Sequence, residues 1–383
     1  MIDLKIIREE IDVVDKQIQE LFERRMELAS KVADYKIATG KSVYDREREK
    51  QKLEVFKSRA SSEFNAQSIQ EIFQQIMGMS RKYQYQLLAS NGKYEKLDFK
   101  PVDALRMEGM KVVYQGVEGA YSYAAMKEFF GEDVDAFHVK TWKDAMEAIT
   151  AGKADYAVLP IENSTAGVVA DIYDLLTEYK LYIVGEQIIS VNHVLLGLPE
   201  ASLEDIKQVY SHPQGLMQCS RFLDEKRGWQ QVSLQNTAAS AKRVVDDGDL
   251  SQAAIASKQA AKNYGLIVLK DHLNDLDNNS TRFVVISHKK MFETDANTIS
   301  ICFETLHQSG SLYSVLSHFI FNGLNMTRIE SRPIHGKPWQ YQFFVDFTGN
   351  LKEQAVKNAL HGIQSETESF RILGNYRGAE TLC

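Results

Sequence analysis

The sequence predicts a multidomain protein in which an all-α segment precedes an α/β segment and a βαββαβ, ferredoxin-like tail. Three observations predict this order. The first 90 residues have a helical period with almost no glycine or proline, the middle alternates short apolar runs with amphipathic stretches, and the tail repeats strand and helix signals in the split-βαβ order. We expect boundaries at residues 1–90, 110–290 and 297–378, with a linker at 91–109.

The bulk composition is that of an ordinary globular protein. A chain of 383 residues with a net charge of −7 is not typical of a nucleic-acid-binding protein, which would present a basic face. No run approaches the roughly 18 apolar residues that span a membrane, and the N-terminus has no apolar core of a signal peptide. Because the cysteines are far apart, we expect a reduced cytoplasmic protein without a metal site; they are Cys219, Cys302 and Cys383.

A heptad seam defines the first helix, which we expect to end near Ala38. Its apolar residues recur at alternating spacings of three and four, and they are Leu4, Ile7, Ile11, Val14, Ile18, Leu21, Leu28, Val32 and Tyr35. Arg25 stands where the seam calls for an apolar residue. Since a buried guanidinium without a partner is costly, Arg25 either pairs with a carboxylate and fixes helix register or binds an anion.

Further polar residues gather on the faces of the same helices. Lys36 lies three turns after Arg25 on nearly the same face, and Ser80 and Gln84 lie one turn apart on a third helix expected over 67–89. The charged stretch "VYDREREK" opens the second helix, where Asp45 can cap it. Such a run is usually a solvated face, and we assign Arg46, Glu47 and Lys50 to solvent but Arg48 and Glu49 to the crevice.

Arg8 predicts a second subunit. It shares a flank of the seam with Lys36, yet the two are about 42 Å apart along one helix. Two antiparallel long helices would bring Arg8 of one chain to the crevice of the other. We therefore expect an intertwined homodimer, or a higher homo-oligomer, that buries the seam.

Polar loops interrupt the α/β segment where open sheets bind ligands. The stretch "DYAVLPIENSTAG" is a buried strand followed by a polar loop and a helix, and "STRFVV" and "VYSHPQ" provide further loops. From composition alone, these loops are either active-site loops or well-capped structural ones.

The helical segment resembles the chorismate mutase family, through "LKIIREEID", "RRMELA", "VYDREREK" and "MGMSRKYQ". That resemblance implies binding of chorismate, a dicarboxylate, and its rearrangement to prephenate. It implies that Lys36 and Gln84 face the ether oxygen and that Asp45 and Glu49 lie near the ring hydroxyl, with Ser80 a minor contact. The carboxylates would be held by Arg8 from the partner chain, Arg25 and Arg48.

The middle segment resembles prephenate dehydratase, through "GAYSYAA", "DYAVLPIENSTAG", "VYSHPQ" and "STRFVV". The resemblance implies two α/β lobes, like those of periplasmic binding proteins, with the site in the cleft. It implies that Thr281 donates to or orients the leaving hydroxyl group and that Phe283 lies against the ring. Substrate contacts would also come from Ser122, Glu162, Asn163, Ser164 and Thr165, whereas we expect His212 to be structural.

The tail resembles the ACT domains of this enzyme class, through "GSLYSVL" and "NMTRIESRPIHGKPW", although Ser311 and Tyr313 depart from the family pattern. The resemblance implies inhibition by phenylalanine bound between two such domains. The implied contacts are Gly310, Leu312, Glu330, Ser331, Arg332 and Pro333. A plain dimerisation module is the alternative.

Together the three resemblances imply a bifunctional enzyme of phenylalanine biosynthesis that needs no cofactor. It would convert chorismate to prephenate and then prephenate to phenylpyruvate. Two alternatives stay open: a non-enzymatic amino-acid sensor with a bilobed binding domain, an ACT domain and a helical dimerisation segment, or a protein that keeps one activity. Arg25 in the seam and the polar pair Ser80 and Gln84 argue against a pure coiled coil.

Overall fold

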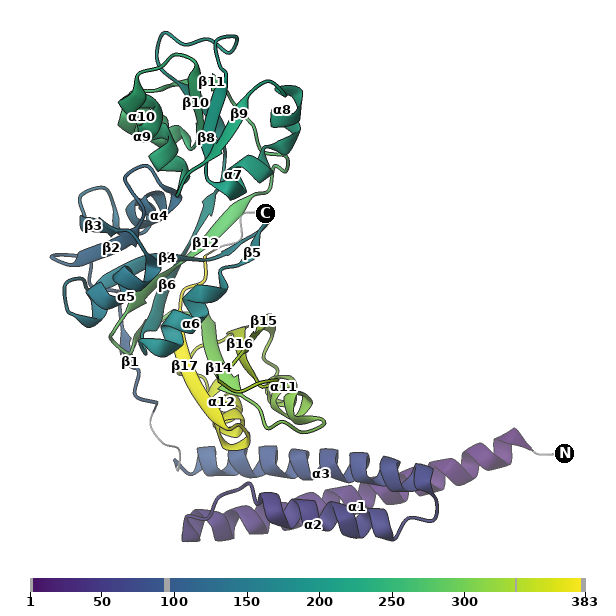
Figure 1. Cartoon of the computed structure of the whole chain (residues 1–383). Helices are drawn as coiled ribbons and strands as arrows, with labels where there is room; N and C mark the ends of the chain where they lie inside the picture. The colour runs from purple at the N-terminus through teal and green to yellow at the C-terminus, as the bar shows by residue number, and fades with distance from the viewer. Residues whose placement is uncertain (1–2, 93–96, 335, 380–383) are drawn as a thin grey trace. The chain divides into compact units, whose positions relative to one another are not determined.

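The computed structural model describes residues 3–92, 97–334 and 336–379, which form two compact units (Figure 1). The first unit comprises residues 1–97 and 301–371, two segments that are far apart in the sequence. The second unit comprises residues 98–300 and 372–383. Most of the tail therefore belongs to the same unit as the helical segment. The regulatory role of the tail remains a prediction.

Three helices open the first unit: α1 Leu4–Thr39, α2 Arg46–Ser58 and α3 Glu63–Ser90. Gly40 ends α1 in the left-handed conformation with φ 69°, which glycine adopts without steric cost. Asp45 caps α2 as predicted, by accepting a hydrogen bond from the Arg48 amide at 3.1 Å. The third helix begins before residue 67, where we expected it, because the Ser62 hydroxyl group caps it through the Asn65 amide at 3.1 Å.

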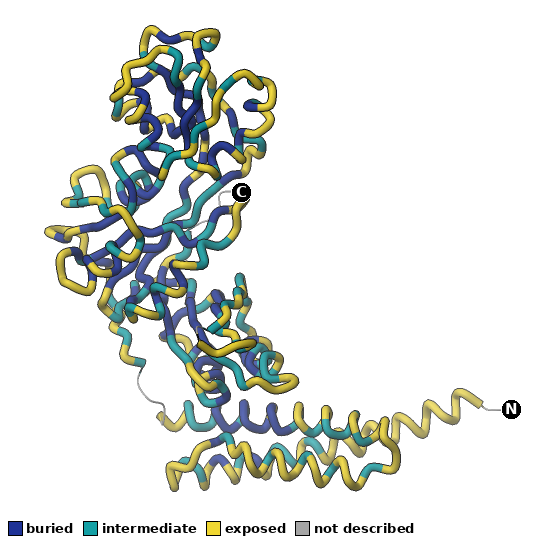
Figure 2. The backbone as a smooth tube through the Cα atoms, viewed as in Figure 1, coloured by how far each residue is buried: buried dark blue, intermediate teal, exposed yellow. Residues whose placement is uncertain are grey.

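The apolar seam of α1 lies uncovered in the single chain (Figure 2). Every one of its nine predicted residues is exposed, from 37% for Ile7 to 65% for Leu21. The small residues Ala29 and Ala33 are the buried ones on α1. An exposed apolar stripe of this length is typical of a surface that packs against another helix.

The tail has the predicted order of strands and helices; its residues 301–371 belong to the first unit, and the start of β14 and the end of β17 belong to the second. The elements are β14 Thr298–Glu304, α11 Ser311–Phe321, β15 Met326–Pro333, β16 Tyr341–Thr348, α12 Gln354–Glu366 and β17 Ser369–Tyr376. Their strands lie in the order β15-β16-β14-β17. This confirms the ferredoxin-like arrangement. Within the first unit α3 packs against α11 and α12, and Tyr85 of α3 is 1% exposed.

The sequence predicts a turn at "PIHGKP" and then a strand with alternating apolar residues from Trp339 to Phe347, and the predicted start of that strand is wrong. The strand begins at Tyr341, and Trp339 lies in the preceding turn with φ 64° and an exposed fraction of 80%. The turn extends further than "PIHGKP" because the Gln340 amide donates to the Lys337 carbonyl at 3.2 Å. The alternation of apolar residues therefore extends to two residues before the first residue of the strand.

A mostly parallel sheet forms the first lobe of the second unit. Its strands lie in the order β6-β12-β4-β2-β3, with β5 on β4, and the tail strand β17 joins β6 where Gly374 pairs with Ile183. The elements are β2 Lys111–Gln115, α4 Tyr121–Phe130, β3 Asp135–Val139, α5 Trp142–Thr150, β4 Tyr156–Asn163, β5 Gly167–Val168, α6 Ala170–Glu178, β6 Tyr182–Ser190 and β12 Ser280–Ser287. Strand β12 runs antiparallel to β4 and β6.

A five-stranded sheet in the order β11-β7-β10-β8-β9 forms the second lobe. The elements are β7 Val194–Gly197, β8 Gln208–Ser211, α7 Pro213–Gln218, α8 Ser220–Glu225, β9 Gln230–Ser233, α9 Thr237–Asp247, β10 Gln252–Ala256, α10 Lys258–Tyr264 and β11 Ile267–Lys270. Helices α9 and α10 cover one face of the sheet, and α7 and α8 cover the other. Two lobes of α/β structure are therefore confirmed.

The chain passes twice between the lobes, at 191–193 and at 271–279. The side chain of Asn274 ties these segments together, since it accepts from the His193 amide at 2.6 Å and donates to the Val191 carbonyl at 2.9 Å. Two short, mutually bonded crossings hold facing edges of both lobes at one place, where a ligand can contact both.

The prediction of a linker over 91–109 is wrong for part of that range. Strand β1, Lys100–Val102, pairs in parallel with β13, Met291–Glu293, and Leu105 is 4% exposed. The short strand was missed because Pro101 weakens its sequence signal. Residues 93–96 lie outside the described residues.

Cys219 and Cys302 are buried, and Cys383 lies outside the described residues. Within the described ranges, no helix is long and apolar enough to cross a membrane. Residues 3–92, 97–334 and 336–379 also contain no cluster of three or more side chains suited to hold a metal ion.

Candidate active sites

A cavity of about 300 Å³ lies between α1, α2 and α3 of the first unit. It is lined by Arg25, Leu28, Ala29, Val32, Lys36, Val43, Asp45, Arg48, Glu49, Lys52, Phe56, Phe73, Met77, Ser80, Arg81 and Gln84. Apart from Arg8, every residue predicted to bind chorismate lies in this cavity. Cationic groups outnumber carboxylates in the lining, so the cavity favours an anionic ligand.

Arg25 and Lys36 line the cavity without a carboxylate partner among the described residues. The Arg25 guanidinium donates to the Ile76 carbonyl at 3.3 Å and to the Ser80 hydroxyl group, and the Lys36 ammonium donates to the Val43 carbonyl at 2.6 Å. Burial lowers the pKa of Arg25, although the charge of Glu49 opposes this shift. Burial also lowers the pKa of Lys36, against the charges of Asp45 and Glu49. A bound carboxylate would offset the cost of burying these two cations.

The charged stretch at the start of α2 divides as predicted. Arg48 and Glu49 line the cavity, whereas Arg46, Glu47 and Lys50 are exposed and do not. Asp45 lines the cavity while capping the helix.

Ser80 and Gln84 reach the cavity from α3 and are buried, at 5% and 6% exposure. The Gln84 carboxamide donates from Nε2 to the Ser80 carbonyl at 3.1 Å. Its Oε1 atom is buried and has no hydrogen-bond partner among the described residues. A buried polar atom without a partner is uncommon, and this one belongs to a residue that lines the cavity.

Arg8 lies on the exposed first turns of α1 and does not line the cavity of its own chain. Sequence reasoning missed two lining cations, Lys52 and Arg81. Lys52 follows Arg48 by one helical turn, and Arg81 follows Met77 by one turn, so helical periodicity on the faces already chosen would have found both.

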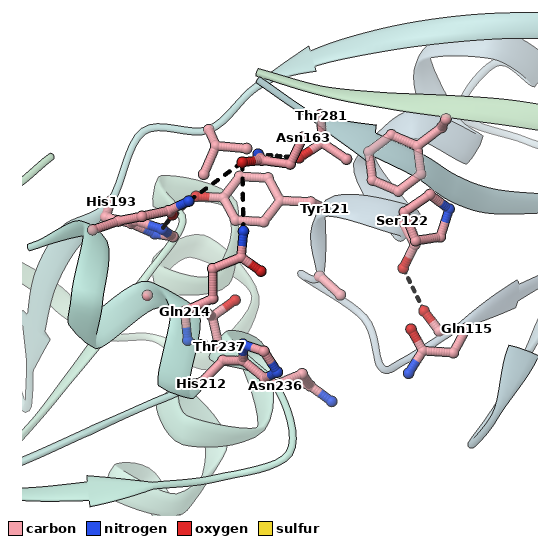
Figure 3. A pocket seen from close by; sticks show the side chains of 16 residues that line it. Gln115, Tyr121, Ser122, Asn163, His193, His212, Gln214, Asn236, Thr237 and Thr281 are labelled. Atoms are coloured by element: carbon pink, nitrogen blue, oxygen red, sulfur yellow. Dashed lines mark hydrogen bonds between the residues drawn. The ribbon is translucent and has the colours of Figure 1, made fainter. Parts of the chain in front are cut away.

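A second cavity, of about 170 Å³, lies between the two lobes of the second unit (Figure 3). It is lined by Gln115, Ala120, Tyr121, Ser122, Pro160, Asn163, Val191, His193, His212, Gln214, Gly215, Gln218, Asn236, Thr237, Thr281 and Phe283. The described residues of the lining include no aspartate, glutamate, lysine or arginine side chain. His193 and His212 are the lining side chains that could gain a charge, by protonation. The first turns of α4 and α9 border the cavity, and their N–H groups favour anions.

Asn163 organises this second cavity (Figure 3). Its Nδ2 atom donates to the Thr281 hydroxyl oxygen at 2.9 Å and to Asn279 Oδ1 at 2.8 Å. Its Oδ1 atom accepts from the amide of Ala166 at 2.9 Å. The Thr281 hydroxyl oxygen accepts this hydrogen bond from Asn163, so its own hydrogen can point to a ligand.

Ser122 and Phe283 line the cavity as predicted, whereas Glu162, Ser164 and Thr165 do not. The Glu162 carboxylate lies 3.9 Å from Arg282, and the Ser164 hydroxyl group donates to the Asn278 carbonyl at 2.9 Å. Side chains alternate across a strand, so Glu162 faces away from the side that Asn163 occupies. The motif brings these residues near the site without placing all of them in it.

A relay of neutral side chains behind Asn163 escaped sequence reasoning. Gln218 Nε2 donates to Thr165 Oγ1 at 2.7 Å, so its Oε1 faces His193 Nε2 at 3.0 Å and receives a hydrogen from it. His193 Nδ1 lies 3.2 Å from the Tyr121 hydroxyl group, which also donates to the Asn192 carbonyl at 3.2 Å. Burial lowers the pKa of His193, although the Gln218 hydrogen bond opposes this shift, so the imidazole is neutral. The lobe crossing that holds His193 has no motif of its own.

His212 has a structural role, as expected, and also lines the cavity. Its Nδ1 accepts from the Gln214 amide at 3.2 Å and caps α7, which leaves Nε2 as the donor. Burial lowers the pKa of His212.

A third cavity, of about 570 Å³, lies at the N-terminal end of α11. Gly310 and Leu312 line it together with Tyr313 and Trp339, whereas Glu330, Ser331, Arg332 and Pro333 do not. Those four residues lie on β15, at one edge of the sheet. One chain therefore separates the two predicted halves of the effector site.

Comparisons with known proteins match both the helical segment and the two-lobed segment. The family model of chorismate mutase type II matches residues 7–85, and that of prephenate dehydratase matches residues 112–291. A bifunctional chorismate mutase/prephenate dehydratase of Enterobacter agglomerans is 33% identical over 381 residues, covering 97% of this chain and 95% of the relative.

Two solved structures are similar over 70% of the chain, each with a TM-score of 0.65. One is a prephenate dehydratase from Arthrobacter aurescens in complex with L-Phe, 31% identical and covered over 89% of its length. The other is GqqA, described as a novel type of quorum quenching acylase, 32% identical and covered over 98%. Because the full-length relative matches both catalytic segments in the same order, the chain belongs to the family of bifunctional chorismate mutase/prephenate dehydratases.

Proposed function

We propose that chorismate rearranges in the cavity between α1, α2 and α3 and that prephenate is dehydrated and decarboxylated in the cavity between the lobes. The observation that carries the first assignment is the pair of half-buried cations Arg25 and Lys36, which have no carboxylate partner among the described residues but share one cavity. The sensor alternative explains neither this pair nor the match to enzymes along the whole chain.

The rearrangement needs no nucleophile and no proton transfer. One C–O bond breaks while one C–C bond forms within the same molecule, and negative charge develops on the ether oxygen. The Lys36 ammonium and the second N–H of Gln84 Nε2 stabilise that charge, while Arg25 and Arg48 hold the carboxylates in the chair-like geometry. Asp45 and Glu49 bind the ring hydroxyl group.

The second reaction converts prephenate to phenylpyruvate, CO₂ and water. The bond to the departing carboxylate breaks, its electron pair enters the ring, and the ring hydroxyl group leaves as water after it gains one proton, which solvent supplies. Asn163 donates to the Thr281 oxygen, so the hydrogen of the Thr281 hydroxyl group is available to orient the leaving group. Since the departing carboxylate loses its charge, a neutral lining avoids stabilising it more strongly in the ground state than in the transition state.

A homodimer would complete the first site. The exposed seam of α1 supports this proposal, because two antiparallel copies would bury it and bring the partner chain's copy of Arg8 to the cavity.

Mixing two defective chains tests the shared site. Arg8→Ala and Lys36→Ala each damage every mutase site of a homodimer, whereas a mixed dimer has one site with both changes and one site with neither. Mixed chains should therefore recover about a quarter of wild-type mutase activity after random pairing. The measurement is chorismate turnover after co-expression with two affinity tags. Activity no greater than the average of the two homodimers would show that each site belongs to one chain.

We further propose that L-phenylalanine inhibits the enzyme from the third cavity, completed by residues 330–333 of a second copy. The complex of the similar Arthrobacter aurescens enzyme with L-Phe supports this. Removing three carbons by Leu312→Ala should raise the inhibitory concentration at least about tenfold, because lost apolar contact weakens binding. Dehydratase assays over a range of L-phenylalanine measure it, with Val268→Ala on β11 as the control. An unchanged inhibition curve would place the effector elsewhere.

A further inference from the structure

A buried ion cluster joins α3 to the C-terminal helices of the first unit. Arg81 and Glu366 are 6% and 7% exposed, although 285 residues separate them. The guanidinium grips the carboxylate with two hydrogen bonds, from Nε to Oε1 at 2.7 Å and from Nη2 to Oε2 at 3.2 Å. A bidentate pair of this kind fixes the orientation of an arginine.

The other end of the same guanidinium reaches the mutase cavity. Arg81 Nη1 donates to the Glu49 carboxylate, and the guanidinium lies over the Tyr44 ring at 4.7 Å from its centre. Arg81 itself lines the cavity. One side chain thus connects a proposed substrate-binding carboxylate to a carboxylate of the C-terminal domain.

Glu366 is held on its remaining sides. The Ser314 hydroxyl group of α11 donates to Oε2 at 3.0 Å, and His318 Nε2 lies 3.3 Å from Oε1. Gly362 makes room for this histidine, since a Cβ there would lie 2.3 Å from the ring. Burial would raise the pKa of Glu366, but His318 and Arg81 outweigh it and hold the pKa at about 2. Glu366 is therefore an anion at every working pH.

We propose that Arg81 is a positioning residue for the chorismate rearrangement and that Glu366 fixes it in place from the C-terminal domain. Without Arg81, the Glu49 carboxylate would turn toward Arg25 and Lys36, which line the same cavity and whose pKa values, lowered by burial, its charge already raises. Pairing with them would neutralise Arg25, which holds a substrate carboxylate, and Lys36, which faces the ether oxygen. The inference rests on the proposed mutase site and adds its dependence on α12.

The same geometry places the proposed effector cavity next to the cluster. Helix α11 supplies Leu312 to that cavity and, within its next two turns, Ser314 and His318 to Glu366. A change at the start of α11 therefore has a direct physical connection to Arg81 and, through it, to the mutase cavity.

Single and double variants of the full chain test the proposal. Removing one partner strands a buried charge and can unfold the unit, whereas replacing both with apolar residues of similar size preserves folding. The double variant Arg81→Met with Glu366→Met should therefore fold, yet lose about 10- to 100-fold in mutase kcat/KM with a raised KM for chorismate. The single variant Arg81→Lys should lose less mutase kcat/KM than the double variant, because lysine keeps a positive charge next to both carboxylates.

The raised KM separates positioning from instability. A partly unfolded sample lowers kcat in proportion to the lost protein and leaves KM unchanged, so an unchanged KM in the double variant would overturn the proposal. Arg59→Gln, an exposed arginine at the end of α2, is the matched control and should keep wild-type KM. If Lys36→Ala also leaves mutase activity intact, the proposed mutase site is wrong. If Lys36→Ala lowers the activity but the Arg81 and Glu366 variants do not change it, only the present inference is wrong.

Discussion

Lys36→Ala should lower the rate of prephenate formation about 100- to 1,000-fold, because it removes a preorganised cation from the oxygen on which charge develops. The lysine lies in the cavity with its ammonium anchored on the Val43 carbonyl at 2.6 Å, so little reorganisation accompanies the reaction. Dehydration of supplied prephenate should stay at the wild-type rate. Chorismate consumption and phenylpyruvate formation, assayed separately on the same preparation, measure the two effects.

Lys50→Ala on α2 is the control for loss of a positive charge near the cavity, because Lys50 is exposed and does not line it. It should keep both activities. A Lys36→Ala protein that is folded but has lost both activities would contradict the separation of the two sites.

Thr281→Val should lower the dehydratase rate about 100- to 1,000-fold while chorismate rearrangement continues unchanged. Valine keeps the branched shape that suits strand β12 but has no hydroxyl group to orient the leaving group. Thr281→Ser restores that hydroxyl group next to Asn163 and should recover much of the rate. Prephenate turnover in the two variants is the measurement.

If the valine variant is as active as the serine variant, the Thr281 hydroxyl group does not orient the leaving group. His212, whose Nε2 atom is a donor at the cavity, would then be the next candidate.

Periodicity predicted most of the fold because regular elements are local. The seam of α1, the cap at Asp45 and the order of β14, α11, β15, β16, α12 and β17 each depend on residues a few positions apart. The prediction was wrong where local signals conflict with backbone geometry. Trp339 continued an apolar alternation into a turn, and Pro101 concealed a short strand.

The site was predictable where a motif or a helical face defines it. Arg25, Lys36, Ser80 and Gln84 follow from the faces of α1 and α3, and Asn163 and Thr281 follow from motifs. Contacts between distant segments were not predictable, since sequence gives no spacing rule for them. The pairing of Arg81 with Glu366 and the relay from Gln218 to Tyr121 both depend on tertiary packing.

The first unit is assembled from two segments that are far apart in the sequence, and this has a consequence for biosynthesis. Helix α3 leaves the ribosome long before α12 is made, and at about 10 residues per second that delay is roughly half a minute. Throughout it, the nascent helices must keep the face around Tyr85 and Arg81 soluble without its final cover. Arg81 can already pair with Glu49 of α2 during this delay, and it gains its second partner, Glu366, once α12 is made, so a charged side chain keeps this face more soluble than a purely apolar patch would.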